Sequence, residues 1–259
     1  MCDVLEFTTQ LAKDAGSTLQ KFYSPNGVKA QLKSDGTVIT DADIASNTII
    51  QESIKHNFPN DGILSEEGRT VYPYDHDYVW VIDPLDGTTN FSLGLHHWGV
   101  SIARLKDGIP DVAALYFPII NELYTCSQNS GVYFNGSELL NYHLKTDSPQ
   151  TFFSCCSRSH RQYHVEIPYK TRMLGSAAYG LITVVKGSAK LAFEVTPKVW
   201  DFAGSWLITT EAGGIMKSLD GDSLFPLIPG EDYNQKSYPV LVAGTTQDWD
   251  SGHRRIQIK

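Results

Sequence analysis

Two aspartates within residues 83–91, whose sequence is D-P-L-D-G-T-T-N-F, have the spacing of a site for hard cations. Asp83 and Asp86 follow the apolar run 79–82, which predicts a buried strand. Carboxylates at one strand end can converge on Mg²⁺, which binds carboxylate, carbonyl and water oxygens and completes its shell with substrate phosphate. Gly87 lets the backbone approach a ligand, and Thr88 offers phosphate an N–H group and a hydroxyl. A capped turn is the alternative, because Asp-Pro and Asp-Gly are common turn dipeptides.

Further stretches could bring more carboxylates to the same site. Residues 200–204 (W-D-F-A-G) open a predicted helix that ends at residues 211–214 (E-A-G-G), and residues 63–68 read I-L-S-E-E-G. Together with the string at 83–91, they resemble the inositol monophosphatase family of magnesium-dependent, lithium-sensitive phosphatases, whose hallmark is D-P-hydrophobic-D-G-T-x-N-F. The resemblance extends from the first predicted helix to about residue 244.

This resemblance implies a site for two or three Mg²⁺ ions and a catalytic group of Glu66, Thr88 and Asp43. In-line attack by a metal-activated water is expected, with Glu66 on the metal that activates the water. Thr88, oriented by Asp43, takes the proton from that water. No serine lies in a G-x-S-x-G elbow, which favours direct attack over a phospho-enzyme. The implied metal ligands are Glu66, Asp83, the Leu85 carbonyl, Asp86 and Asp201.

The resemblance also implies a substrate side of the site. Glu194 lies seven residues before Asp201, the spacing at which inositol-cleaving relatives place a hydroxyl-binding glutamate. A carboxylate can accept hydrogen bonds from two adjacent ring hydroxyls, so Glu194 suits a polyol. The implied substrate-binding residues are Gly87, Thr88, Gly175, Ser176, Ala177, Glu194 and Asp201.

Several residues near these positions have competing interpretations. Asp43 matches the family position that orients a threonine hydroxyl, and Asp41 competes with it as the N-cap of the helix predicted to begin near residue 40. Asp201 could itself be a helix N-cap, which is compatible with metal binding. Lys33 matches a family lysine near the metals but fits an exposed strand edge equally well. Glu67 is expected at the surface rather than on a metal.

Composition and charge restrict the classes of partner. The 259 residues carry a formal charge of −8, which argues against nucleic-acid binding. No run approaches the roughly 20 apolar residues of a membrane span, and the acidic N-terminus differs from a signal peptide, so the cytoplasm is the expected location. Adjacent His96 and His97 would point to opposite faces of a strand and so do not predict a zinc pair. An acidic protein repels an anionic substrate unless bound cations invert the local charge, as Mg²⁺ would.

The pattern of apolar residues predicts a mixed fold, α+β in its first part and α/β in its second. Helices are expected over 4–23 and 40–58, and a strand over 28–33. Short strands separated by turn residues predict an antiparallel meander over 98–134. In the second half, strands near 151–155, 190–193, 215–217 and 240–243 alternate with helices 176–185 and 201–212. We expect two intimate subdomains, residues 1–145 and 146–259, and the resemblance implies the layered αβαβα sandwich of sugar phosphatases.

The favoured hypothesis is a Mg²⁺-dependent phosphate monoester hydrolase that converts myo-inositol phosphate and water to myo-inositol and phosphate. The resemblance implies a homodimer. One alternative is a phosphatase of the same fold acting on fructose 1,6-bisphosphate, 3′-phosphoadenosine 5′-phosphate or histidinol phosphate. Another is a metal-bound regulatory or partner-binding protein without turnover. A structural Ca²⁺ site is disfavoured, because no EF-hand loop is present.

Overall fold

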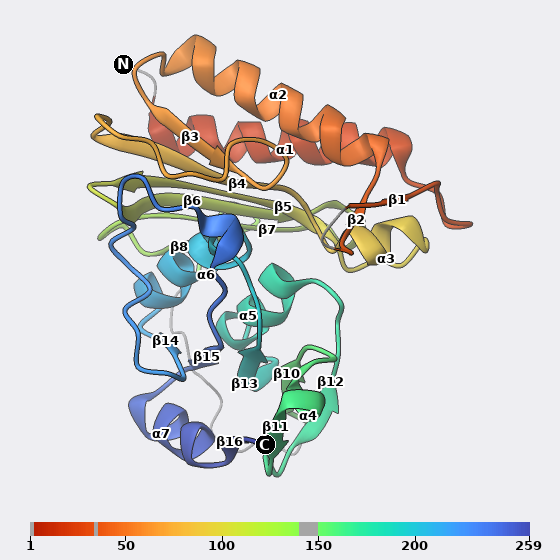
Figure 1. Ribbon diagram of the computed structural model, residues 1–259, viewed down its shortest axis with the longest axis vertical. Helices are drawn as coiled ribbons and strands as arrows, with labels where there is room; N and C mark the ends of the chain where they lie inside the picture. Colours follow the sequence, from red (N-terminus) through yellow and green to blue (C-terminus); the bar gives the residue numbers. More distant parts are fainter. Residues whose placement is uncertain (1–2, 34–35, 140–149) are drawn as a thin grey trace.

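The computed structural model describes residues 3–33, 36–139 and 150–259, and their elements stack in five layers (Figure 1). Helices α1 (Val4–Phe22) and α2 (Asp41–Asn57) cover one face of a large sheet. Helices α5 (Ala177–Val185) and α6 (Val199–Glu211) lie between this sheet and a smaller one. Helix α7 (Thr246–Arg254) covers the outer face of the smaller sheet. The predicted αβαβα sandwich is therefore confirmed.

The large sheet is a meander with one parallel strand added at its edge. Its strand order is β3-β4-β5-β6-β7-β8-β9, in which β3 and β4 are parallel and every other pair is antiparallel. The antiparallel meander expected from the sequence is confirmed. The strands are β3 (Gly62–Ser65), β4 (Tyr78–Asp86), β5 (Gly99–Lys106), β6 (Ile109–Phe117), β7 (Glu122–Ser127), β8 (Val132–Phe134) and β9 (Ser137–Glu138).

Strand β4 is apolar on both faces because helices cover both faces of the sheet. Trp80 and Ile82 pack into the core beneath α1 and α2. Val79 and Val81 belong to the core on the opposite face, which α6 closes. The strand continues to Asp86, three residues beyond the end predicted at Asp83. Its register against β5 shifts between these two aspartates, as at a β-bulge, which re-aims side chains.

The smaller sheet has the order β12-β10-β13-β15-β14. Strand β10 is parallel to both its neighbours, and the pairs β13-β15 and β14-β15 are antiparallel. Two further pairs of short strands are antiparallel, β1 with β2 and β11 with β16. These strands are β10 (Phe152–Cys155), β12 (Lys170–Arg172), β13 (Ala189–Glu194), β14 (Ile215–Ser218), β15 (Val240–Ala243), β1 (Gln31–Leu32), β2 (Val38–Ile39), β11 (Tyr163–Val165) and β16 (Ile256–Ile258).

Some element boundaries differ from those expected. The strand predicted over 28–33 is reduced to the two residues of β1. Helix α6 begins at Val199 rather than Asp201, so that Asp201 lies in its first turn and is not its N-cap. Helices α3 (Thr88–Ser92), α4 (Ser159–Gln162) and α7 were not predicted, because α3 and α4 are short and α7 is polar.

The predicted subdomain boundary at residues 145 and 146 lies outside the described residues and stays a prediction. The strands of each sheet all come from the same side of that boundary in the sequence. Helix α6 nevertheless packs on the large sheet, so the two halves share a core. No helix in the described part of the chain is both long and apolar enough to cross a bilayer.

Candidate active site

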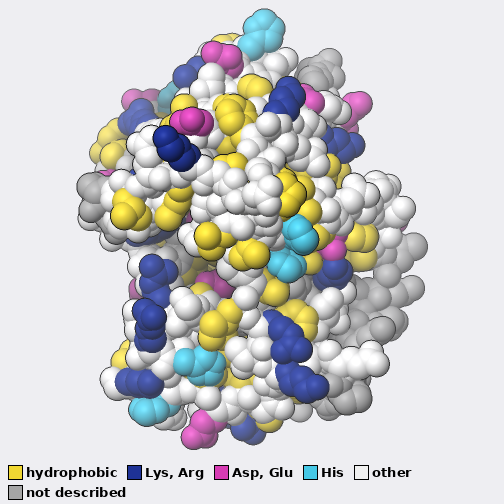
Figure 2. Space-filling view, turned by 90° about the vertical axis from the view of Figure 1, so that its right-hand side faces the viewer, with side chains coloured by type: hydrophobic (Ala, Val, Ile, Leu, Met, Phe, Trp, Pro, Cys, Tyr) yellow, Lys and Arg dark blue, Asp and Glu magenta, His cyan; other side chains and the backbone are white. Residues whose placement is uncertain are grey.

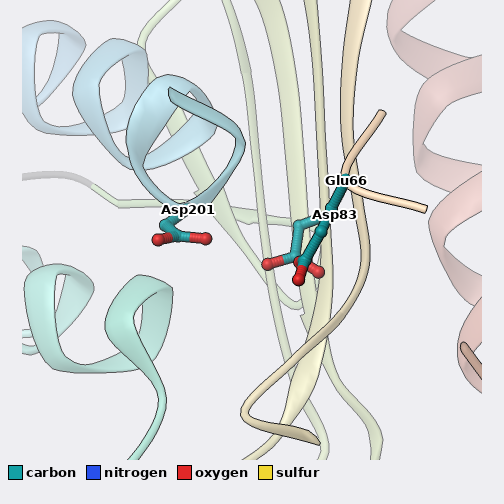
Figure 3. Close-up of side chains that lie close together, drawn as sticks. All are labelled: Glu66, Asp83 and Asp201. Carbon is teal, nitrogen blue, oxygen red and sulfur yellow. The ribbon is translucent and has the colours of Figure 1, made fainter. Parts of the chain in front are cut away.

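Three carboxylates from three different elements meet at one end of the large sheet. Ser65 and Ile82 are partners in the parallel β3-β4 register, so the following residues, Glu66 and Asp83, are adjacent. The first turn of α6 brings Asp201 to the same place. Figure 3 shows that the three side chains point toward a common space, and their carboxylate oxygens lie within 4.8 Å of one another. We call this group the carboxylate triad.

The triad is electrostatically unfavourable without a counter-charge. Burial raises the pKa of Asp83 well above its usual range, and repulsion by Glu66 and Asp86 adds to this effect. Burial and the same two neighbours raise the pKa of Asp201. Burial also raises the pKa of Glu66 to about 7, although Lys33 opposes that shift. An all-oxygen set of converging carboxylates suits a hard divalent cation, so these residues fit Mg²⁺.

Asp86 lies beside the triad but has protein partners of its own. Its carboxylate accepts hydrogen bonds from the Ser176 hydroxyl and from the backbone N–H groups of Ala177 (3.0 Å) and Ala178 (3.1 Å). Burial raises the pKa of Asp86 to about 6, and these donors oppose the shift. Asp86 therefore connects β4 to the N-terminus of α5. Its role as a metal ligand stays a prediction.

Thr88 and Asp43 form the predicted pair. The Thr88 hydroxyl lies 3.0 Å from Asp43 Oδ1 and 3.0 Å from the Leu85 carbonyl oxygen, and it can donate its hydrogen bond to either. Asp43 Oδ2 in turn accepts from the backbone N–H of Thr40 (2.7 Å) and from its hydroxyl (2.6 Å). Thr40, not Asp41, is the N-cap of α2. The alternative role for Asp41 is thus wrong, because the Thr40 hydroxyl satisfies the first turn and Asp43 closes the capping box.

Gly87 is required by the backbone where β4 passes into α3. Its φ is +85°, a left-handed conformation that favours glycine. A Cβ atom there would lie 2.9 Å from the His97 carbonyl oxygen and 3.1 Å from Ser176 Cβ. The first amides of α3 have no acceptor within the helix and follow directly from this glycine.

One cavity is bordered by the triad, and a second cavity adjoins it. The first, about 290 Å³, is bordered by the triad, Leu85, Asp86, Gly87 and Thr88. The second, about 450 Å³, is bordered by Glu194 and by the predicted substrate residues Gly175, Ser176 and Ala177. Both cavities are also bordered by Thr89, Gly175 and Arg158, so they are contiguous.

Glu194 borders the second cavity and is buried, with only 9% of the residue exposed. Burial raises its pKa well above the usual range, and the neighbouring Cys156 adds to the shift. The structure thus brings the predicted metal and substrate residues to two adjoining cavities.

Lys33 and Glu67 have partners that the sequence did not reveal. Lys33 Nζ lies 3.1 Å from Glu66 Oε1 and also pairs with Glu67. Although burial acts to lower it, the two glutamates hold the pKa of Lys33 above its ordinary value. The exposed-edge interpretation of Lys33 is therefore wrong. So is the expected surface position of Glu67, whose side chain is only 6% exposed.

Sequence reasoning missed two arginines. Arg158 borders both cavities, and Arg161 borders the second. They follow strand β10 in the sequence S-R-S-H-R, residues 157–161. A cluster of basic residues directly after a buried strand was the available signal, because strand ends are where site residues gather in parallel sheets.

Comparison with known proteins agrees with this geometry. The profile of the inositol monophosphatase family matches residues 1–254. The chain belongs to the inositol monophosphatase family. That membership confirms the resemblance found in the sequence and supports a magnesium-dependent phosphatase.

Family relatives include Nus factor SuhB of Escherichia coli (strain K12), which is 33% identical in an alignment of 237 residues that covers 85% of this chain and 87% of the relative. The solved inositol monophosphatase of Anabaena (Nostoc) sp. PCC 7120 is 26% identical, with a TM-score of 0.75 over 97% of this chain and 94% of that one. The extragenic suppressor protein SuhB of Bartonella henselae is 25% identical, with a TM-score of 0.77 over 97% of each chain. These structures share the sandwich fold described above.

Proposed function

We propose that this chain hydrolyses phosphate monoesters of small polyols, myo-inositol phosphate first among them, with two or three Mg²⁺ ions. The observation that carries the proposal is the convergence of Glu66, Asp83 and Asp201 within 4.8 Å, beside a cavity that Thr88 also borders. Three carboxylates held this closely need a counter-charge, and a phosphate ester needs its own charge neutralised.

The residues that would hold Mg²⁺ are the triad, with Asp86 and the Leu85 carbonyl beside it. Bound Mg²⁺ would neutralise charge on the phosphate and lower the pKa of a water molecule. The phosphate would lie against the amides that follow Gly87, where α3 begins and the backbone can approach closely.

Thr88 and Asp43 would move the proton. As the water oxygen bonds to phosphorus and the ester P–O bond in line with it breaks, Thr88 Oγ1 would accept a proton from the water and pass its own proton to Asp43 Oδ1, 3.0 Å away. A solvent water would give a proton to the leaving alkoxide oxygen. Burial raises the pKa of Asp43, although its hydrogen bonds oppose this, and a raised pKa favours acceptance of the proton. The alcohol part would fill the second cavity, where the Glu194 carboxyl group can bind ring hydroxyls.

Three further properties belong to the same proposal, because the resemblance implies them. They are inhibition by Li⁺, assembly as a homodimer and a cytoplasmic location. A family phosphatase acting on fructose 1,6-bisphosphate or a phosphonucleotide remains the nearest alternative. The relatives named Nus factor SuhB motivate a second candidate, a metal-bound protein that binds a protein partner without turnover.

The test uses two adjacent glutamates as a matched pair. Glu66 and Glu67 both contact Lys33, but only Glu66 belongs to the triad. We expect Mg²⁺-dependent release of phosphate from myo-inositol 1-phosphate by the native protein, and its loss in chelator. Glu66→Gln should lower kcat/KM by about 100-fold or more, because one anionic ligand is removed, whereas Glu67→Gln should retain most activity.

Phosphate release is measured colorimetrically over a panel of inositol phosphates, fructose 1,6-bisphosphate and phosphonucleotides. Circular dichroism of each variant serves as the folding control. Equal rates for the two variants, or full activity in chelator, would show that the triad is not a catalytic metal site. A folded protein that binds Mg²⁺ but hydrolyses none of the panel would favour the partner-binding candidate.

A further inference from the structure

The two cavities of the site are bordered by different halves of the chain. Among the described residues, all but three of those that border the cavity of the triad come from the first half, residues 36–89. The second cavity takes only Thr89 and Asn90 from that half, and the rest of its described border comes from residues 156–194. A substrate with its phosphate at the triad and its alcohol part in the second cavity therefore spans both halves, whose relative position must be fixed.

Asn90 lies within α3 at the place where the two halves meet, and it is buried. Its side-chain Nδ2 donates one hydrogen bond to the His97 carbonyl oxygen and one to the Leu174 carbonyl oxygen, both at 2.7 Å. Because both partners are acceptors, the atom between them must be the amide nitrogen and not the amide oxygen. His97 precedes β5, and Leu174 lies between β12 and α5. One amide group thus joins the first half to the second.

The segment 173–175 passes directly against this amide group. Gly175 has a φ of +78°, and a Cβ atom on it would lie 2.5 Å from Asn90 Oδ1 and 2.8 Å from Nδ2. Glycine is therefore required for the close approach. In Figure 1 the chain rises from β12 toward α3 before α5 begins. Figure 2 shows this side of the molecule, where hydrophobic side chains lie across the middle, between the upper and lower parts.

The neighbours of this junction have other contacts that hold them. The His97 ring stacks on Tyr179 of α5, with centroids 5.0 Å apart and an interplanar angle of 28°. Asp86 separately holds the N-terminus of α5 on β4 through its own hydrogen bonds. Loss of the Asn90 amide should therefore displace the segment 173–175 while α5 and the triad stay in place.

We propose that Asn90 is a positioning residue that holds the alcohol part of the substrate in line with the phosphate. This inference rests on the proposed function and concerns the same site. In-line displacement depends on where the leaving oxygen lies, and a misplacement of about 1 Å can lower the rate by roughly 100-fold. Asn90 Nδ2 has no hydrogen left for the substrate, because both are donated to backbone carbonyls. Asn90 acts through the segment 173–175, which leads to the predicted substrate residues.

The experiment compares a polyol ester with an aryl ester in saturating Mg²⁺. The ring hydroxyls of myo-inositol 1-phosphate can reach Glu194, whereas p-nitrophenyl phosphate has no such hydroxyl. Asn90→Leu should lower kcat for the inositol ester by about 10- to 100-fold, with KM changed by less than about threefold, because the alcohol part still enters the cavity but is held out of line. Turnover of the aryl ester should fall by less than about threefold. Leucine has the branched shape of asparagine but cannot donate hydrogen bonds.

A matched pair of alanine variants controls for stability. Asn135 Nδ2 also donates to a backbone carbonyl, that of Asn121 at 2.9 Å, but Asn135 borders neither cavity. Asn90→Ala should show the selective loss, and Asn135→Ala should leave the ratio of the two rates unchanged even if its Tm is lower. Gly175→Ala forces the segment away from an intact Asn90 amide and should show the same selective loss.

Circular dichroism and the rise of Tm in Mg²⁺ show that each variant is folded and binds metal. An equal loss on both esters, native rates, or a change confined to KM in the Asn90 variants overturns the positioning role while the phosphatase proposal stands. So does recovery of the rate in Asn90→Leu but not in Asn90→Ala, which would assign the effect to volume. If neither Asn90 variant folds, Gly175→Ala decides by the same ratio.

The native protein tests the proposed function in the same assay. Absence of Mg²⁺-dependent turnover of both esters overturns the phosphatase proposal and this inference with it. Hydrolysis of the aryl ester but of no polyol ester overturns the polyol substrate class, and the positioning role with it, because no polyol then occupies the second cavity.

Discussion

Thr88 has surroundings that allow either a catalytic or a structural role. Its hydroxyl can donate to Asp43 Oδ1 or to the Leu85 carbonyl, both at 3.0 Å. A hydrogen bond from the Thr88 hydroxyl to the Leu85 carbonyl stabilises the turn between β4 and α3. A hydrogen bond from the same hydroxyl to Asp43 forms a route for a proton. The two roles predict different effects of removing the hydroxyl, because only the proton route affects the rate.

We expect Thr88→Val to lower kcat by about 10²- to 10⁴-fold with KM and Mg²⁺ affinity nearly unchanged. Valine retains the shape of threonine but cannot accept or pass a proton. Thr88→Ser keeps the hydroxyl and should recover most of the rate. Steady-state kinetics and thermal unfolding are measured on both variants. A Thr88→Val protein of reduced thermal stability with near-normal kcat would assign the hydroxyl to the turn alone.

Among the elements, α5 connects the site to the fold through its N-terminus. Ser176 is its N-cap and accepts from the Tyr179 N–H at 3.1 Å, while its hydroxyl donates to Asp86 on β4. Negative charge at a helix N-terminus is stabilising, so Asp86 and α5 hold each other in place across the layers. Ser176 therefore affects both the stability of α5 and the position of a predicted metal ligand.

Ser176→Ala should lower the free energy of unfolding by about 1 kcal/mol, the usual cost of losing a cap, and should also lower kcat/KM. Thr245→Ala is the comparison, because Thr245 caps α7 in the same way on the outer layer, away from the triad. It should reduce stability by a similar amount without a loss of activity. Urea unfolding and initial rates are measured for both. If Ser176→Ala lost stability alone, Asp86 would not depend on this hydroxyl.

Over the whole molecule, the acidic site is assembled from both sides of the sandwich core. Glu66 and Asp83 come from the large sheet, and Asp201 comes from α6 beneath it. Folding therefore brings together carboxylates that are far apart in the unfolded chain. That assembly makes stability depend on pH and on Mg²⁺, because a buried, crowded carboxylate has a higher pKa than a free one.

The pKa of Glu66 is about 7 and that of Asp86 about 6, both above the roughly 4 of free carboxylates. Between about pH 4 and pH 7 the folded, metal-free protein thus binds more protons than the unfolded chain, so its stability falls as pH rises through that window. We expect a lower Tm at pH 8 than at pH 5 in chelator. Mg²⁺ should raise Tm more at pH 8 than at pH 6, because protons compete for the same oxygens.

Thermal scans with and without Mg²⁺ at each pH measure both effects, and Glu66→Gln should reduce both. Equal stabilisation by Mg²⁺ at pH 6 and pH 8 would be incompatible with carboxylates of raised pKa as the ligands. A higher Tm at pH 8 than at pH 5 in chelator would contradict the linkage to Glu66 and Asp86.

Local sequence determined the family, most of the element types and most of the candidate site residues. The run 79–82 is apolar throughout because helices cover β4 on both sides, and that pattern is visible without coordinates. The string at 83–91 identified Asp83, Asp86, Gly87 and Thr88, because a strand end followed by a glycine turn is itself a local feature. The end of β4 was not visible in the sequence, since the bulge after Asp83 depends on pairing with β5.

Tertiary structure alone decided which side chains meet. The parallel register of β3 and β4 joins Glu66 to Asp83, and the packing of α6 adds Asp201. Glu67 was predicted to be a surface residue from the sequence, but packing between elements buries its side chain against Lys33. Arg158 and Arg161 border the second cavity only because the chain after β10, including α4, packs beside it. Periodicity reports burial along one element, whereas contacts between elements distant in the chain depend on register and packing across layers.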